Sequence, residues 1–127
     1  MNDPLALTLD AGALIAFARR DRRVAAIVLR ARQRGVSLVV PIGALAQAWR
    51  GGRHNPLRAL IAAAGVHTAE LSTAMATAAG ELCAARGSSD VVDASVVLVA
   101  RQHGGRVATS DPDDLRRLDP HLDVVHV

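Results

Sequence analysis

Short apolar segments alternate with longer helix-like segments along the whole chain, and this alternation restricts the fold more than any other feature. The segments with the character of strands buried on both faces lie at 5–9, 37–40, 66–68, 106–109 and 124–127. Helical periodicity, caps and glycine stops place helices at 11–19, 22–34, 44–50, 56–64, 72–86, 90–103 and 112–118. Strands that alternate with helices form parallel sheets covered on both faces. We therefore predict an α/β fold, a three-layer α/β/α sandwich around a central, mainly parallel sheet of roughly five strands.

The length of 127 residues fits one domain, which we place at 1–127. Such a chain buries about two-thirds of its unfolded surface. Half of the residues are hydrophobic, but no apolar run approaches the roughly 20 residues of a transmembrane helix. The N-terminal segment carries Asp3 where a signal peptide would carry basic residues. A single cysteine, Cys83, forms no intramolecular disulfide and is expected to be a small core residue. We expect a cytoplasmic protein that does not associate with membranes.

The basic residues are distributed unevenly, and all of them are arginine. Ten of the 15 lie between Arg19 and Arg58, whereas seven of the 12 acidic residues lie from Asp90 onward. The lack of lysine excludes a phosphate-binding loop of the Walker A type. A basic face beside an acidic cleft would suit a phosphate polymer. The alternative is a bias in composition, with most of the arginines simply solvated.

Four aspartates occupy positions where an expected strand leads into an expected helix. Asp10 follows the first strand, Asp90 and Asp93 open the segment 90–103, and Asp111 follows the strand at 106–109. The carboxyl ends of parallel strands lie along one edge of a sheet, so these acids are expected to meet in one crevice. Clustered carboxylates repel one another unless a cation joins them, and hard oxygen ligands suit Mg²⁺ or Mn²⁺. The pattern therefore predicts a metal site and metal-assisted attack on a phosphate.

Each of these aspartates also has a purely structural interpretation as a helix cap. Asp111 precedes a proline and two acids, Asp90 has Asp93 three residues later, and Asp10 precedes the first helix. Ser, Thr or Asn would cap equally well, so the recurrence of aspartate favours a shared site. Asp93 carries the most weight because a wholly apolar run follows it, and an unpaired charge in a buried helix is costly.

Four segments of the chain stand out in this order: LTLDAGALIAF, VVPIGALAQAW, SDVVDASVVLVA and RVATSDPDDL. Taken together they resemble the PIN-domain ribonucleases, and especially the VapC-type toxins of bacterial toxin–antitoxin pairs, over essentially the whole chain. The resemblance implies that Asp10 and Asp93 are the principal metal ligands and that Thr109 and Asp111 form a T-x-D element. It also implies Mg²⁺- or Mn²⁺-dependent cleavage of RNA that leaves 5′-phosphate and 3′-hydroxyl ends. The expected partners are RNA, a second copy of the chain in a homodimer, and a small antitoxin that covers the cleft.

Gln47 is the departure from this pattern, because it stands where the family usually has glutamate. Glutamine keeps the side-chain length and one carbonyl oxygen but loses a negative charge, so metal affinity should drop. Asp90, Asp113 or Asp114 would then have to contribute to the site. The alternative is that Gln47 is simply an exposed helix residue.

The expected catalytic set is therefore Asp10, Asp90, Asp93 and Asp111, with Asp90 orienting water or ligands. Arg50 is a candidate contact to the substrate, because aromatic residues make up only 2% of the chain and leave RNA to be held mainly through its phosphates.

Two other functions compete with catalysis. One is a PIN-fold module that binds RNA or an antitoxin without turnover, which the missing glutamate at position 47 would favour. The other is a nucleotide-binding domain, against which DAGAL follows the first strand in place of G-x-G-x-x-G.

Overall fold

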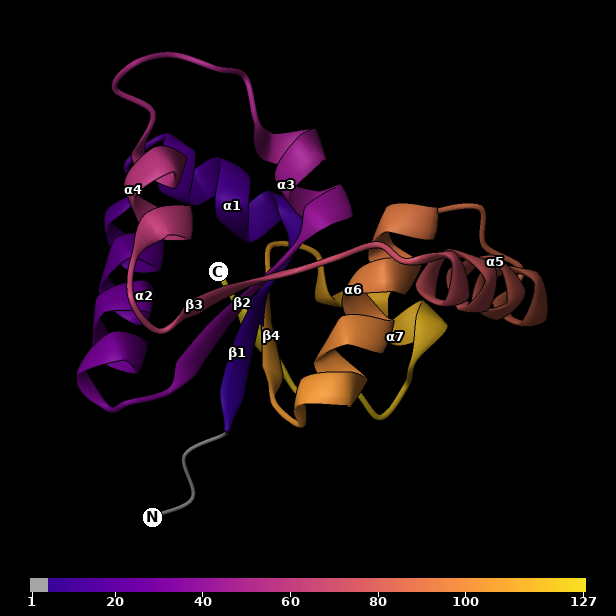
Figure 1. Cartoon of the computed structure of the whole chain (residues 1–127). Coiled ribbons are helices and arrows are strands. Elements are labelled where there is room, and N and C mark those ends of the chain that lie inside the picture. Colours follow the sequence, from indigo (N-terminus) through magenta and orange to yellow (C-terminus); the bar gives the residue numbers. More distant parts are fainter. Residues whose placement is uncertain (1–4) are drawn as a thin grey trace.

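The computed structural model describes residues 5–127, which form one parallel sheet with helices on both of its faces (Figure 1). The strands are β1 (Ala6–Leu9), β2 (Ser37–Pro41), β3 (Val66–Ala69), β4 (Arg106–Thr109) and β5 (Val124–His126). The helices are α1 (Ala11–Ala18), α2 (Arg22–Gln33), α3 (Ile42–Ala48), α4 (Pro56–Ala62), α5 (Thr73–Arg86), α6 (Val91–His103) and α7 (Pro112–Leu118). Asp3, on which the argument against a signal peptide depends, lies outside the described residues.

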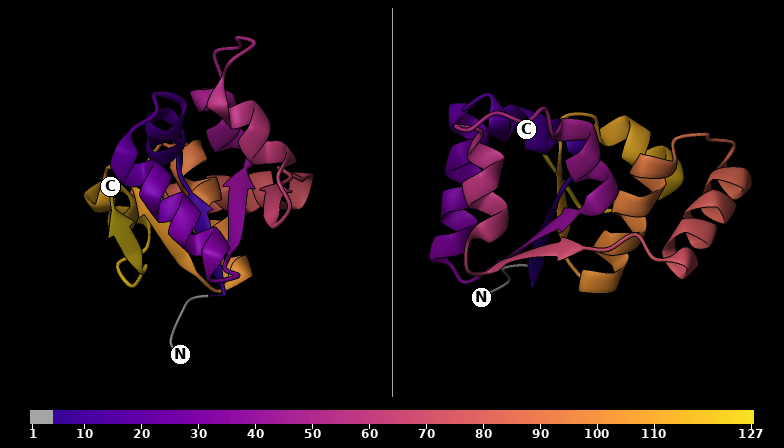
Figure 2. Two further views of the ribbon diagram at one scale, coloured as in Figure 1. Left: turned by 90° about the vertical axis from the view of Figure 1, so that its left-hand side faces the viewer. Right: turned by 45° about the horizontal axis from the view of Figure 1, so that its top comes forward.

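The strand order in the sheet is β3-β2-β1-β4-β5, and every neighbouring pair is parallel. Figures 1 and 2 show α1, α2 and α4 on one face of the sheet and α5, α6 and α7 on the other. Helix α3 follows β2 directly and contacts both α1 and α6. The predicted three-layer α/β/α sandwich is therefore confirmed. No helix between residues 5 and 127 combines the length and hydrophobicity needed to cross a membrane.

The central strands are buried on both faces, as their continuous hydrophobic sequence predicts. All four residues of β1 and four of the five residues of β2 are buried. Successive side chains point to opposite faces, so Leu7 and Leu38 join the main core while Ala6 and Val39 pack with Val99 of α6. The edge strands β3 and β5 are more exposed. Strand β1 therefore lies at the centre of the sheet, with β2 and β4 on either side of it.

The limits of α3 differ from the predicted helix at 44–50. Helix α3 begins at Ile42, directly after Pro41, which both ends β2 and precedes the helix as its N-cap residue. It ends at Ala48 because Trp49 adopts an extended backbone with φ −77° and ψ 126°. Trp49 and Arg50 therefore belong to a loop rather than to the helix. The remaining limits differ from prediction by two residues or fewer, for example at the end of α4.

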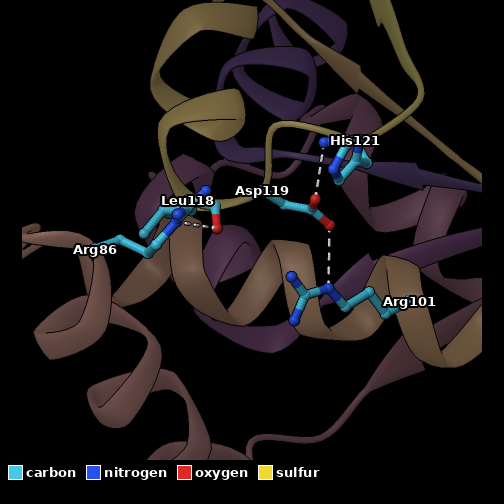
Figure 3. A network of polar contacts seen from close by, with 5 residues as sticks. All are labelled: Arg86, Arg101, Leu118, Asp119 and His121. Carbon is cyan, nitrogen blue, oxygen red and sulfur yellow. Dashed lines mark hydrogen bonds and ion pairs between the residues drawn. The ribbon is translucent and has the colours of Figure 1, made fainter.

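The turn between α7 and β5 is fastened to α5 and α6 by polar contacts (Figure 3). Arg101 donates from Nε to Asp119 Oδ2 over 3.1 Å, and the backbone N–H of His121 donates to Asp119 Oδ1 over 3.0 Å. Arg86 donates to the carbonyl of Leu118 over 3.3 Å. Burial alone would raise the pKa of Asp119, but the bonds from His121 and Arg101 outweigh it and the pKa is lowered. The stability that this carboxylate contributes is therefore lost only as the pH falls through its lowered pKa.

Gly105 is expected to be indispensable for the junction between β4 and β1. A Cβ atom at this position would collide with the backbone carbonyl of Ala6, and backbone cannot rotate away as a side chain can. We predict that Gly105→Ala lowers the free energy of unfolding by about 1–3 kcal/mol. Gly80→Ala is the control, because the helical Gly80 has nothing within 4 Å of the added Cβ. The control should stabilise the protein by about 0.5–1 kcal/mol. Urea unfolding measures both, and equal midpoints for Gly105→Ala and the wild type would contradict the close approach.

Candidate active site

The pairing of β1 with β4 brings two aspartates to the same edge of the sheet. Leu9 is in register with Ala108, and the backbone N–H of Asp10 donates to the carbonyl of Ala108 over 3.2 Å. Asp111 follows β4 by two residues. Its backbone N–H donates to Thr109 Oγ1 over 2.9 Å, and Thr109 is itself fully buried. The carboxyl edge of the sheet therefore holds Asp10 and Asp111 as the prediction required.

Asp10 is buried, with only 5% of its surface exposed. It caps α1, because its Oδ1 accepts the backbone N–H of Ala13 over 2.8 Å. Burial raises the pKa of Asp10, and the charge of Asp111 adds to this rise. Hydrogen bonds from Thr109 and from the backbone of Ala13 oppose it without cancelling it. The folded protein therefore stabilises the ionised form of Asp10 less well than water does.

Asp93 lies in the first turn of α6 and is partly buried. Burial, and then the charge and hydrogen bonding of Asp90, raise the pKa of Asp93 from its ordinary value of 3.8 to about 7. The charges of Asp10 and Asp114 contribute further to the rise. The pKa of Asp93 is therefore raised by acids at the end of β1, at the start of α6 and in α7.

Five aspartates influence one another electrostatically and are called here the acid cluster: Asp10, Asp90, Asp93, Asp111 and Asp114. Asp114 was not among the main predicted residues, although it was expected as a substitute. Hydrogen bonding to Asp111 and the charge of that residue raise the pKa of Asp114. Among the described residues, only Asp114 of this cluster is close to an arginine, with Arg117 Nη1 at 3.9 Å. The cluster thus gathers negative charge with almost no positive side chain to balance it.

The PIN-domain family matches residues 7–120, which is most of the chain and includes every member of the acid cluster. The chain belongs to the PIN-domain family. PIN domains are typically nucleases, and they commonly use divalent metal ions. A search of curated proteins finds no match.

The donor atoms of this PIN domain suit a hard cation, although the carboxylates are not closed around one. Over residues 5–127, no three side chains of His, Cys, Asp or Glu are arranged as a group that could hold a metal ion. Several of these acids also serve as caps: one oxygen of Asp90 accepts the N–H of Asp93 over 3.0 Å, and one oxygen of Asp111 accepts the N–H of Asp114 over 3.4 Å. Each carboxylate has a second oxygen, so capping and metal binding are compatible.

Gln47 and Arg50 line a cavity to which Arg19 also contributes, and none of these carboxylates is among its lining residues. Gln47 is exposed, and its side chain forms no hydrogen bond with the described part of the PIN domain. Gly43, one turn earlier on α3, faces α6, since a Cβ there would lie 3.6 Å from Ser95 Oγ. Gln47 lies one turn further along the same side of α3, where it lines the cavity.

Gly12 is a residue that the sequence reading missed. A Cβ atom at this position would collide with the side chain of Ser110, so α1 packs closely against the segment that carries Asp111. The pKa of Asp10 is also influenced by a backbone hydrogen bond from Gly12. The only signal in the sequence is the glycine two residues after Asp10, in DAGAL.

The raised pKa of Asp93 predicts an unusual pH dependence for the metal-free protein. The folded state keeps a proton on Asp93 that the unfolded chain has already released, so the free energy of unfolding should fall as the pH rises from about 4 to about 7. Asp93→Asn should remove much of this fall. Asp113→Asn, which changes an exposed neighbouring acid in the same way, should retain it. Urea unfolding in EDTA on either side of the Asp93 pKa is the measurement. The same dependence of the unfolding free energy on pH in all three proteins would mean that burial and the neighbouring acids do not raise the pKa of Asp93.

Proposed function

We propose that this PIN domain is a Mg²⁺- or Mn²⁺-dependent endoribonuclease that acts as the toxin of a toxin–antitoxin pair. The observation that carries the proposal is the convergence of aspartates from β1, α6 and the β4–α7 junction on one edge of the sheet. Clustered carboxylates that lack positive partners suit a divalent cation, and such a cation suits a phosphodiester substrate.

Asp10 and Asp93 would hold the metal ion directly, because burial and like charge destabilise their ionised forms and a cation would relieve both effects. When bound, the ion supplies charge neutralisation at the phosphate and a water molecule of lowered pKa. The protein's own residues set the conditions for this chemistry. Asp93 must release its proton before it can act as a ligand, so ion binding should release protons near neutral pH.

Asp111 and Asp90 would act around the two direct ligands. Asp111 would contribute through water or to a second ion, and Asp90 would orient water or the Asp93 carboxylate. The hydrogen bond between the Asp111 N–H and Thr109 Oγ1 supports this assignment, because it ties Asp111 to the buried end of β4. Asp90 is exposed at the start of α6, where one of its two carboxylate oxygens accepts the N–H of Asp93.

The toxin role rests on the resemblance of four segments, carrying Asp10, Gln47, Asp93 and Asp111, to VapC-type toxins. With it come the proposals that the protein is cytoplasmic, forms a homodimer, and is inhibited by a small antitoxin that covers the acid cluster. The RNA products would carry 5′-phosphate and 3′-hydroxyl ends.

A PIN-fold module that binds RNA or an antitoxin without turnover is the second candidate. Gln47 favours it, because it is exposed and neutral at the position where the family usually has glutamate. Metal-dependent cleavage by the purified protein separates the two functions.

Asp93→Asn should abolish cleavage while the protein remains folded, because the two side chains have nearly the same shape. Loss of a group that only supports a metal ligand costs about 10–100-fold, so loss of a ligand should cost at least about 100-fold. The measurement is cleavage of RNA with Mg²⁺, Mn²⁺ or EDTA, after circular dichroism has verified the fold. Glu81→Gln, which removes the charge of an exposed acid on α5 outside the acid cluster, is the control and should cleave like the wild type. Wild-type activity in Asp93→Asn would leave Asp93 with a structural role alone.

Gln47→Glu should bind Mn²⁺ more tightly if the side chain can turn toward the acid cluster. An added opposite charge at about 4 Å from the ion is worth about 1–4 kcal/mol at effective dielectrics between water and a protein surface. Repulsion from Asp10 and Asp93 offsets part of this gain. Calorimetric titration of Mn²⁺ measures the difference, with Gln33→Glu at an exposed position of α2 as the control. Equal affinities in all three proteins would show that Gln47 lies outside the metal site.

A further inference from the structure

A cavity of about 570 Å³ lies between the C-terminal half of α1, the end of α3 and the loop that follows α3. Four arginines line it: Arg19, Arg20, Arg50 and Arg53. No aspartate or glutamate is among its lining residues. In Figure 1 the connection from α3 to α4 arches above α1, and this arch contributes Arg50 and Arg53. The cavity is therefore strongly positive and separate from the acid cluster.

The arch over the cavity is held in place by side chains that bind its backbone. Asn55 donates from Nδ2 to the carbonyl of Gly51 over 3.1 Å. Arg58 donates to the carbonyl of Gly52 over 2.8 Å and lies over the ring of Trp49, with its guanidinium carbon 4.9 Å from the ring centroid. These contacts give the loop a defined shape without occupying the arginines of the cavity.

Arg20 fastens the arch to the end of α1, and its backbone is strained. Its φ is +60°, a left-handed conformation that is uncommon for any residue other than glycine. Glycine is the usual residue at this position after a helix. The Arg20 side chain instead donates to the carbonyl of His54 over 2.9 Å, which joins α1 to the loop. The arginine thus performs a function here that glycine could not.

Most of the hydrogen-bonding capacity of the four arginines remains unused. Arg20 and Arg50 each donate one side-chain N–H group to a backbone carbonyl, and the bond from Arg50 Nη1 to Trp49 is 2.7 Å long. The side chains of Arg19 and Arg53 form no hydrogen bond or ion pair within residues 5–127. An arginine has five N–H donors in a fork that matches phosphate oxygens. Four such groups around one hollow suit an anion with several oxygens.

Helix α1 connects the cavity to the acid cluster. Asp10 caps its start, and Ile15 and Arg19 line the cavity. At a rise of 1.5 Å per residue, these two residues lie about 8 Å and about 14 Å from Asp10 along the helix axis. A strand with one phosphate at the acid cluster could therefore place a neighbouring phosphate in the cavity. Because the chain has one Phe, one Trp and no Tyr, contacts to phosphate rather than base stacking would mainly hold the strand.

We propose that this cavity binds backbone phosphates of the RNA strand next to the bond that is cut, with Arg19 and Arg53 as the principal contacts. The identity of the strand rests on the proposed function, whereas the binding of phosphate rests on the cavity itself.

The test compares two double variants that each remove two positive charges. Arg19→Gln/Arg53→Gln changes the cavity, and Arg30→Gln/Arg32→Gln changes exposed arginines on α2 that do not line it. Binding of a short fluorescein-labelled oligoribonucleotide is followed by anisotropy in EDTA over a range of salt concentrations, so that no cleavage is needed. The cavity variant should lower the slope of log K against log salt by roughly 1.4, since each contact to single-stranded phosphate contributes about 0.7. The α2 variant should keep the wild-type slope.

Equal slopes in the two double variants would overturn the proposal, provided that both proteins unfold at the wild-type temperature. Competition separates a strand from a free anion: unlabelled oligoribonucleotide should displace the labelled one at a far lower concentration than inorganic phosphate does. Displacement by both competitors at the same concentration would also overturn the proposal. Cleavage with Mg²⁺ or Mn²⁺ is measured separately. If the wild-type protein shows a steeper salt dependence of binding than the cavity variant but does not cleave RNA, the proposed function is contradicted and the proposed phosphate site is not.

Discussion

The parallel pairing of β1 with β4 is the constraint on which the rest of the molecule depends. It sets Asp10 beside the end of β4, and it requires the close approach of Gly105 to the Ala6 carbonyl at the opposite end of the same pair. Helix α1 then leaves the carboxyl edge directly at Asp10 and ends beside the arginine cavity. One pair of central strands thereby determines where both charged regions of this PIN domain lie.

The two charged regions are complementary, and each has little or no counter-charge of its own. The acid cluster has one arginine at 3.9 Å from Asp114, while the cavity has no acidic residue in its lining. Repulsion inside each region raises the free energy of the folded protein. A metal ion and a phosphate chain are ligands of opposite sign that would relieve the two kinds of repulsion separately. The proposed function would bring both ligands to the protein together.

The sheet and the acids could be predicted from sequence because each depends on local pattern and on one topological rule. Buried strands read as continuous apolar segments, and the carboxyl ends of parallel strands meet, so Asp10 and Asp111 were expected at one edge. The direction of Gln47 could not be predicted, because it depends on where α3 ends and on how α3 packs against α6. The arginine cavity could not be predicted either. It depends on the extended backbone at Trp49 and on the left-handed conformation of Arg20, and neither conformation leaves a periodic pattern in the sequence.

The helix caps of the acid cluster have a consequence for the evolution of this protein. Asp10, Asp90 and Asp111 each accept a backbone N–H at the start of a helix, a task that asparagine or serine performs nearly as well. Replacement of one of these acids would remove a charge from the site and keep the helix start intact. Selection for folding therefore does not preserve the carboxylates, and only selection for the chemistry can. A lineage that no longer needed catalysis could lose it by single substitutions and still inherit a stable binding protein.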